Sequence, residues 1–135
     1  MQPLPEAEDF SDLHGKRKGC TVPLVEHRGM TVFQIGDIMR HIRRRCNREG
    51  WTNILNLKLE HDTVTLYDAT RFIIRPATYE RSCSYMELVS RKAQIPGWYV
   101  CHWWGEPVKH FLDCLNAHCD DRNLNRAEKP YWICA

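Results

Sequence analysis

The chain has 135 residues, of which 43% are hydrophobic and 27% charged, and its 19 basic and 17 acidic side chains give a formal net charge of +2. This length suits a single domain, and the charge balance excludes a strongly basic nucleic-acid arm or an acidic tail as its main feature. No apolar stretch reaches the roughly 20 residues of a membrane-spanning helix. Residues 1–16 contain acidic side chains where a signal peptide has an apolar core.

Seven cysteines, an odd number without any Cys-x-x-Cys pair, predict free thiols in a reducing compartment rather than a disulfide framework. We therefore expect an intracellular, most simply cytoplasmic, protein. One helix face offers an alternative use for a thiol, because His110, Cys114 and His118 follow one another at intervals of four residues. With a fourth ligand from elsewhere, these three could hold zinc. No resident cofactor is predicted otherwise.

Residues 1–19 contain prolines, acidic residues and a basic triplet, a composition typical of a flexible arm. A helix is predicted from Thr31, which has capping-box spacing to Gln34. Apolar residues then recur with helical spacing from Ile35 to Cys46, and Gly50 ends the helix.

The opposite face of this helix is basic, with no acidic residue between positions 38 and 48. Such a face is typical of binding to phosphate, nucleic acid or a membrane surface, although a solvated face with dipole compensation has the same composition. The candidate anion-binding residues are Arg40, Arg43, Arg44, Arg45 and Arg48.

Leucines alternate with polar residues over 55–59, and a second alternating run follows at 63–66. These runs predict a β-hairpin. An irregular stretch is expected next, because Pro76 favours an extended conformation for the residue before it. Ser84 and Glu87 form another capping box and predict a short helix. Residues 20–92 are thus expected to be a helix and hairpin region.

The C-terminal region, residues 93–135, has the pattern of a βαβ unit. Residues 98–102 read as a buried strand, a helix starts at Val108 after Pro107, and residues 131–134 read as a second strand. Such a unit implies two parallel strands with a right-handed crossover. The predicted class is therefore α/β, and residues 20–135 can pack as one domain.

The loop after the first strand is the predicted binding site, since ligands of open parallel sheets bind at the carboxyl ends of strands. Gly105 allows a sharp turn, the paired indoles offer stacking surfaces, and Glu106 can accept a hydrogen bond from a ribose or cap the helix. Alternatively, the indoles plug the end of the sheet. The candidate binding residues are Trp103, Trp104, Gly105 and Glu106.

The same loop also contains residues that could serve in catalysis. Glu106 is a candidate acid/base group for nucleotide hydrolysis, and Cys101 is a candidate nucleophile beside His102. Neighbours on a strand point to opposite faces, which disfavours pairing of the thiol with the imidazole.

Three runs, residues 84–89, 98–107 and 131–135, resemble a group of uncharacterised dinoflagellate proteins with the motif W-[FY]-V-S-H-W-W-G-E-P. Residues 66–78 resemble the segment that precedes the motif, so the resemblance spans roughly residues 63–135. Cys101 stands where the group has serine, and a hydroxyl role therefore does not transfer to this position.

More loosely, residues 101–106 are similar to the opening of Toll/interleukin-receptor (TIR) domains. That resemblance implies the start of a flavodoxin-like parallel sheet, homotypic interaction and, in some members, NAD cleavage. The catalytic glutamate of the cleaving members follows the second strand, so no residue here matches it. The βαβ unit is then expected to be incomplete. Its missing neighbours would come from residues 20–90, from another chain or from a longer protein.

Together these observations favour a non-catalytic interaction or scaffold module, or a small subunit of a larger assembly, with other protein chains as partners. The alternatives are a TIR-like enzyme that processes nucleotides or NAD, and an anion- or nucleic-acid-binding module that uses the arginine face.

Overall fold

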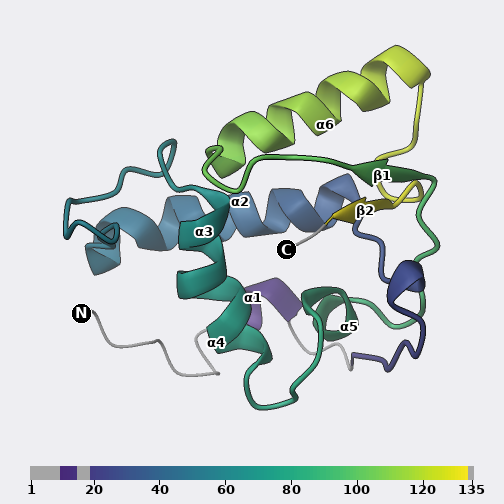
Figure 1. The fold of residues 1–135 in the computed structure, drawn as a ribbon, viewed down its shortest axis with the longest axis horizontal. Helices are drawn as coiled ribbons and strands as arrows, with labels where there is room; N and C mark the ends of the chain where they lie inside the picture. Colours follow the sequence, from purple (N-terminus) through teal and green to yellow (C-terminus); the bar gives the residue numbers. More distant parts are fainter. Residues whose placement is uncertain (1–9, 15–18, 134–135) are drawn as a thin grey trace.

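The computed structural model describes residues 10–14 and 19–133, and it is mostly helical with a small two-stranded parallel sheet (Figure 1). Part of the predicted flexible arm is helical. Helix α1 (Ser11–His14) lies against α2, with Phe10 and Leu13 buried in the core. These two apolar side chains attach the segment to the rest of the molecule. The rest of the arm, residues 1–9 and 15–18, lies outside the described residues.

Helix α2 (Val32–Glu49) confirms the first prediction at both ends. The Thr31 hydroxyl accepts a hydrogen bond from the Gln34 backbone, and the Gln34 side chain accepts one from the Thr31 backbone. Gly50 ends the helix in the left-handed conformation, with a φ of 64° that favours glycine. The apolar stripe of α2 is buried, as its spacing predicts.

The predicted hairpin at 55–66 does not form. The Asn53 side chain accepts hydrogen bonds from the backbone N–H groups of Leu55 and Leu57, at 2.9 and 3.0 Å, and so folds the segment into a local turn. Both leucines are exposed, and Thr52 and Lys58 form an isolated antiparallel bridge. The alternation was misleading because this local hydrogen bonding takes the backbone N–H groups that a strand ladder needs.

The stretch predicted to be irregular is one continuous helical segment, made of α3 (Leu66–Ala69), a π-helical turn (Thr70–Ile74) and α4 (Arg75–Thr78). Arg75 is helical rather than extended, with its N–H donating to the Thr70 carbonyl. Proline in an ordinary helix clashes with the carbonyl four residues earlier. The wider π turn directly precedes Pro76 and offers one way to relieve that clash.

Helix α5 (Tyr85–Val89) begins at the predicted Ser84–Glu87 capping box, which is confirmed. The βαβ order is confirmed as well. Strands β1 (Trp98–Val100) and β2 (Tyr131–Ile133) are parallel, with α6 (Val108–Arg122) between them in sequence. Figure 1 shows α6 along one side of the strands. Beyond the second strand, residues 134–135 lie outside the described residues.

The two parts of the chain share one core. Met30 and Tyr131 exchange backbone hydrogen bonds of 2.7 and 2.8 Å, which bring the start of α2 onto β2. Trp51 and Phe72 lie at its centre, both almost completely buried. All six cysteines within the described residues are free thiols. In the same part of the chain, none of the helices combines the length and the apolar character that crossing a membrane requires.

Candidate functional site

The backbone of the predicted binding loop also has a structural role, which the sequence analysis did not predict. The carbonyls of Trp104 and Glu106 accept hydrogen bonds from Tyr67 and Leu66, each at 3.2 Å. These donors belong to the first turn of α3, where helix geometry leaves N–H groups without partners. Val108 in turn donates to the Val64 carbonyl at 2.8 Å. The loop therefore caps one helix while it begins another.

The two adjacent tryptophans of this loop lie in different environments. Trp103 is 73% exposed, and its indole lies so close to Gly105 that a side chain at that position would collide with it. Trp104 is half-buried, with its ring centroid 5.6 Å from that of Tyr67, which is itself 60% exposed. Only Trp103 thus presents most of its surface to solvent.

The candidate catalytic residues lie in different environments. His102 packs inward, with its ring 6.0 Å from Trp104 and 4.9 Å from Phe111, whereas Cys101 is exposed. Glu106 is half-buried. A groove of about 460 Å³ lies between β1 and α6. Its walls include all three catalytic candidates and two of the three predicted zinc ligands, namely Cys101, His102, Glu106, Cys114 and His118.

The predicted zinc ligands spread along α6. His110 and Cys114 are exposed, whereas the Nδ1 of His118 lies 2.7 Å from the Tyr131 hydroxyl. Over residues 10–14 and 19–133, no group of three or more histidine, cysteine or acidic side chains is placed to hold a metal ion. Helical spacing puts the three residues on one face, but His110 and His118 are two helical turns apart, about 12 Å along the axis, which is too far for both to bind one ion.

The two faces of the small sheet differ. On one face, Trp98 and Tyr131 pack against His118 of α6, with ring centroids 5.1 and 5.6 Å from the imidazole. On the other, Tyr99 is 68% exposed and lies 5.9 Å from Trp132. Strand alternation therefore buries one set of aromatic rings and exposes the next.

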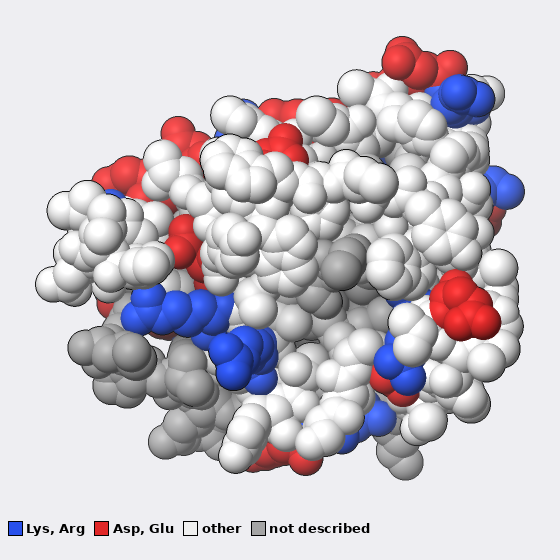
Figure 2. All heavy atoms as spheres, in the orientation of Figure 1, with Lys and Arg blue, Asp and Glu red and all other residues white. Residues whose placement is uncertain are grey.

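Five exposed or half-exposed aromatic rings from the loop, the two strands and α3 are grouped below as the aromatic surface. Figure 2 shows an almost entirely uncharged band that runs from β1 along the loop toward α6. Sequence reasoning found the two loop tryptophans and missed the contributions of the strands and of α3. The aromatic surface consists of Tyr67, Tyr99, Trp103, Trp104 and Trp132.

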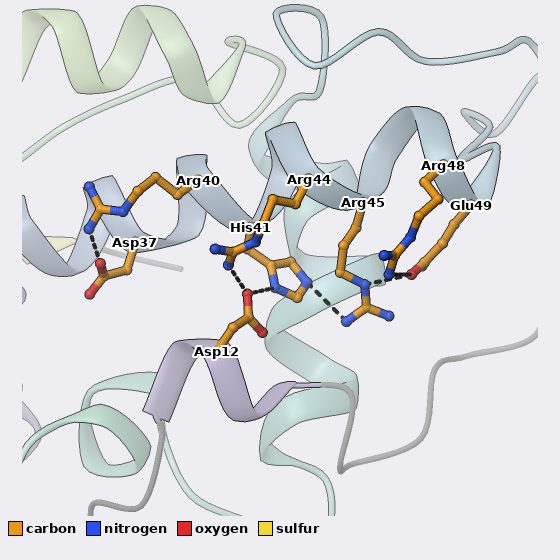
Figure 3. Close-up of polar contacts among 8 residues, drawn as sticks. All are labelled: Asp12, Asp37, Arg40, His41, Arg44, Arg45, Arg48 and Glu49. Carbon is orange, nitrogen blue, oxygen red and sulfur yellow. Dashed lines mark hydrogen bonds and ion pairs between the residues drawn. The ribbon is translucent and has the colours of Figure 1, made fainter.

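The arginine face of α2 is largely neutralised by carboxylates (Figure 3). Arg40 pairs with Asp37, and Arg44 pairs with Asp12 of α1. Glu49 lies 2.5 Å from Arg45 and 4.0 Å from Arg48. Arg43 is exposed, whereas Arg45 is buried with its guanidinium 5.5 Å from the Phe10 ring centroid. Arg45 therefore belongs to the core and not to a surface for anions.

His41 lies completely buried at the centre of this network. Its Nδ1 is 2.7 Å from the Asp12 carboxylate, and its Nε2 is 3.5 Å from the Arg45 guanidinium. Arginine only donates, so Nε2 is the acceptor and a neutral His41 carries its proton on Nδ1. Burial lowers the pKa of His41 below 6.5, against the opposing effect of Asp12. Burial by itself would raise the pKa of Asp12, but contacts with His41 and Arg44 bring it below 3.8.

We expect this network to weaken in acid. A histidine whose folded-state pKa is depressed stabilises the fold above its unfolded pKa of about 6.5, and this contribution is lost as pH falls through the folded value. The Asp12 contribution has the same sign and is lost at lower pH. Urea unfolding between pH 7 and pH 5 should show falling stability, and NMR titration should place the His41 pKa below 6.5. A measured pKa at or above 6.5, or a proton on Nε2, would contradict the assignment.

A cavity of about 220 Å³ opens between α2, α3, α5 and β2, and sequence reasoning did not find it. Its walls are mainly apolar. Tyr85 is one of the lining residues, and its buried hydroxyl has no hydrogen-bond partner among the described residues. Figure 2 shows the molecule hollowed near the middle of this face. The walls include Met30, Ile35, Ile38, Leu66, Ala69, Met86 and Ile133.

Comparison with protein-family models, with curated proteins and with solved structures finds no significant match to this chain. The resemblance to TIR domains and to the dinoflagellate group therefore stays a prediction.

Proposed function

We propose that the chain is a non-catalytic protein-interaction module and that its first partner is a second copy of itself. The observation that carries the proposal is the aromatic surface, in which Tyr67, Tyr99 and Trp103 are each more than half exposed. Tyrosine and tryptophan are the residues that contribute most often to binding energy at protein interfaces. None of these three residues belongs to the buried core.

The sheet supports the choice of partner. Within the described residues, β1 pairs with β2 alone, so its outer edge is open to another strand. Parallel sheets are normally covered on both faces, whereas here Tyr99, on the face away from α6, is 68% exposed. A second copy that meets this face and edge would supply what the βαβ unit lacks. In the same proposal, the unit corresponds to the opening of a TIR-like, flavodoxin-like sheet, a class whose members associate homotypically.

Removing two rings of the aromatic surface should abolish association. We expect the wild-type chain to show concentration-dependent association in sedimentation velocity experiments. The double variant Tyr99→Ala/Trp103→Ala should associate at least ~30-fold more weakly, the loss expected for interface hot spots. Tyr79→Ala is the matched control, because Tyr79 is 82% exposed but follows α4, away from the sheet.

The control variant should associate as the wild type does. A wild-type chain that stays monomeric to millimolar concentration would contradict the homotypic proposal, and so would a double variant that associates normally. Circular dichroism of both variants establishes that the substitutions leave the fold intact.

A further inference from the structure

A second exposed apolar feature lies in the segment between α2 and α3, at one end of the molecule (Figure 1). Ile54 is 87% exposed, Leu55 is 75% exposed and Leu57 is 59% exposed. Single apolar side chains on a surface are common, but neighbouring ones form a patch, and exposed apolar patches mark sites of interaction. None of the three belongs to the buried core or to the aromatic surface.

The apolar loop, residues 53–57, stands on a fixed base. Trp51 and Leu59, on either side of the loop, are buried, and the Leu59 N–H donates to the Trp51 carbonyl at 2.8 Å. Thr52 and Lys58 form the next bridge toward the tip. The loop is therefore a protrusion anchored in the core, and its exposed side chains belong to a defined backbone shape.

The backbone of the apolar loop forms its hydrogen bonds within the loop. The Asn53 side chain accepts from the N–H groups of Leu55 and Leu57, at 2.9 and 3.0 Å. The Asn53 backbone donates to the Leu57 carbonyl and accepts from the Asn56 N–H, both at 2.9 Å. A segment that enters the apolar part of a membrane must pair its polar groups internally, because lipid chains cannot replace water as partners. These four N–H groups meet that requirement.

The composition of the loop favours a lipid surface over a protein partner. Hot spots of protein interfaces are rich in tryptophan, tyrosine and arginine, whereas leucine is under-represented. Aliphatic side chains gain free energy simply by leaving water, and a bilayer accepts them without a complementary pocket. A convex tip with three aliphatic side chains therefore suits a bilayer better than a second protein.

The nearest cations lie beside the two ends of the loop. Lys58 is exposed, and the Arg71 guanidinium lies 3.5 Å from the Thr52 carbonyl. With the tip inserted, these groups would lie at the level of the phosphates in the lipid headgroups. Glu60 and Asp62 are exposed a few residues further along the chain and balance the two positive charges. We therefore expect apolar contact, rather than net charge, to supply most of the affinity.

We propose that the apolar loop docks on the surface of a phospholipid bilayer. Ile54, Leu55 and Leu57 insert among the lipid chains, and Lys58 and Arg71 lie beside the headgroup phosphates. This site is separate from the aromatic surface, and it does not depend on self-association.

Flotation of the full chain with lipid vesicles tests the proposal. We expect the wild type to float with vesicles of phosphatidylcholine, which carry no net charge. Ile54→Ser/Leu55→Ser should lower the partition coefficient at least ~10-fold, because two large apolar side chains then no longer leave water. Leu24→Ser/Ile95→Ser is the matched control, since it removes two aliphatic side chains, 49% and 60% exposed, outside the loop. The control should float as the wild type does.

Asn53→Ala tests the hydrogen bonding of the loop separately. It keeps all three aliphatic side chains but removes the acceptor of two N–H groups, so we expect about fivefold weaker partitioning. Circular dichroism establishes that each variant is folded. Tyr99→Ala/Trp103→Ala should float as the wild type does, which separates this site from the aromatic surface.

Three results would overturn the proposal. The first is a wild-type chain that does not float with phosphatidylcholine vesicles at millimolar lipid. The second is flotation only when the vesicles also contain phosphatidylserine, because binding would then depend on charge and not on apolar insertion. The third is normal flotation of Ile54→Ser/Leu55→Ser or of Asn53→Ala. Loss of self-association in Ile54→Ser/Leu55→Ser, with flotation unchanged, would assign the loop to a protein interface instead.

Discussion

Replacing Trp51 by alanine is expected to lower the free energy of unfolding by about 3–5 kcal/mol, the usual cost of truncating a buried aromatic side chain. Trp51 is completely buried, and its ring stacks on Phe72 with centroids 4.7 Å apart and planes 3° from parallel. Its indole N–H also donates to Glu49 at 3.1 Å. The substitution therefore removes a large packing surface, opens a cavity and leaves a carboxylate with one donor fewer.

Urea denaturation followed by far-ultraviolet circular dichroism measures this loss. A small domain has only about 5–15 kcal/mol of stability, so the variant is expected to unfold at far lower urea concentration. Trp103→Ala is the matched control, since its ring is mostly exposed, and it should change stability by no more than about 0.5 kcal/mol. Equal effects of the two substitutions would show that the core is not centred on Trp51.

The second large effect is expected at Glu87, where Glu87→Gln should cost about 2–3 kcal/mol. One carboxylate oxygen accepts from the Val22 backbone at 2.9 Å, and the other accepts from the backbone and hydroxyl of Ser84 at 3.0 and 2.9 Å. Arg28 lies 3.6 Å away. Whichever way the glutamine amide turns, its NH₂ group meets a donor, and the charge opposite Arg28 is lost.

The pH dependence of this loss has a defined sign. Burial by itself would raise the pKa of Glu87, but the hydrogen bonds from Ser84 and Val22 and the charge of Arg28 bring it below 4.5. The stabilisation is complete above the unfolded pKa and disappears as pH falls through the folded one. Urea unfolding should therefore show a wild-type advantage at pH 7 that narrows toward pH 3. Glu26→Gln, at an exposed position, is the control and should have little effect. An advantage that persists at pH 3 would contradict this.

Local signals predicted local structure well. The boxes at Thr31 and Ser84 located the starts of α2 and α5, because a capping side chain and its target lie three residues apart. A third box, Thr65 with Asp68, was overlooked, although it would have revealed the helix that starts at Leu66. The alternating leucines of 55–59 wrongly predicted a strand, because the Asn53 side chain accepts hydrogen bonds from this backbone and folds it into a turn.

By itself, the sequence determined where α2, α5 and α6 begin and that a strand precedes and another follows α6, since caps and hydrophobic periodicity act over a few residues. Only the tertiary structure decided which charges are neutralised and which tryptophan is exposed. These features depend on groups far apart in the chain. The hydrogen bond between Asp12 and His41 joins residues 29 positions apart, and the one between Val22 and Glu87 joins residues 65 positions apart. No local pattern specifies such pairs, because they form only when the helices pack.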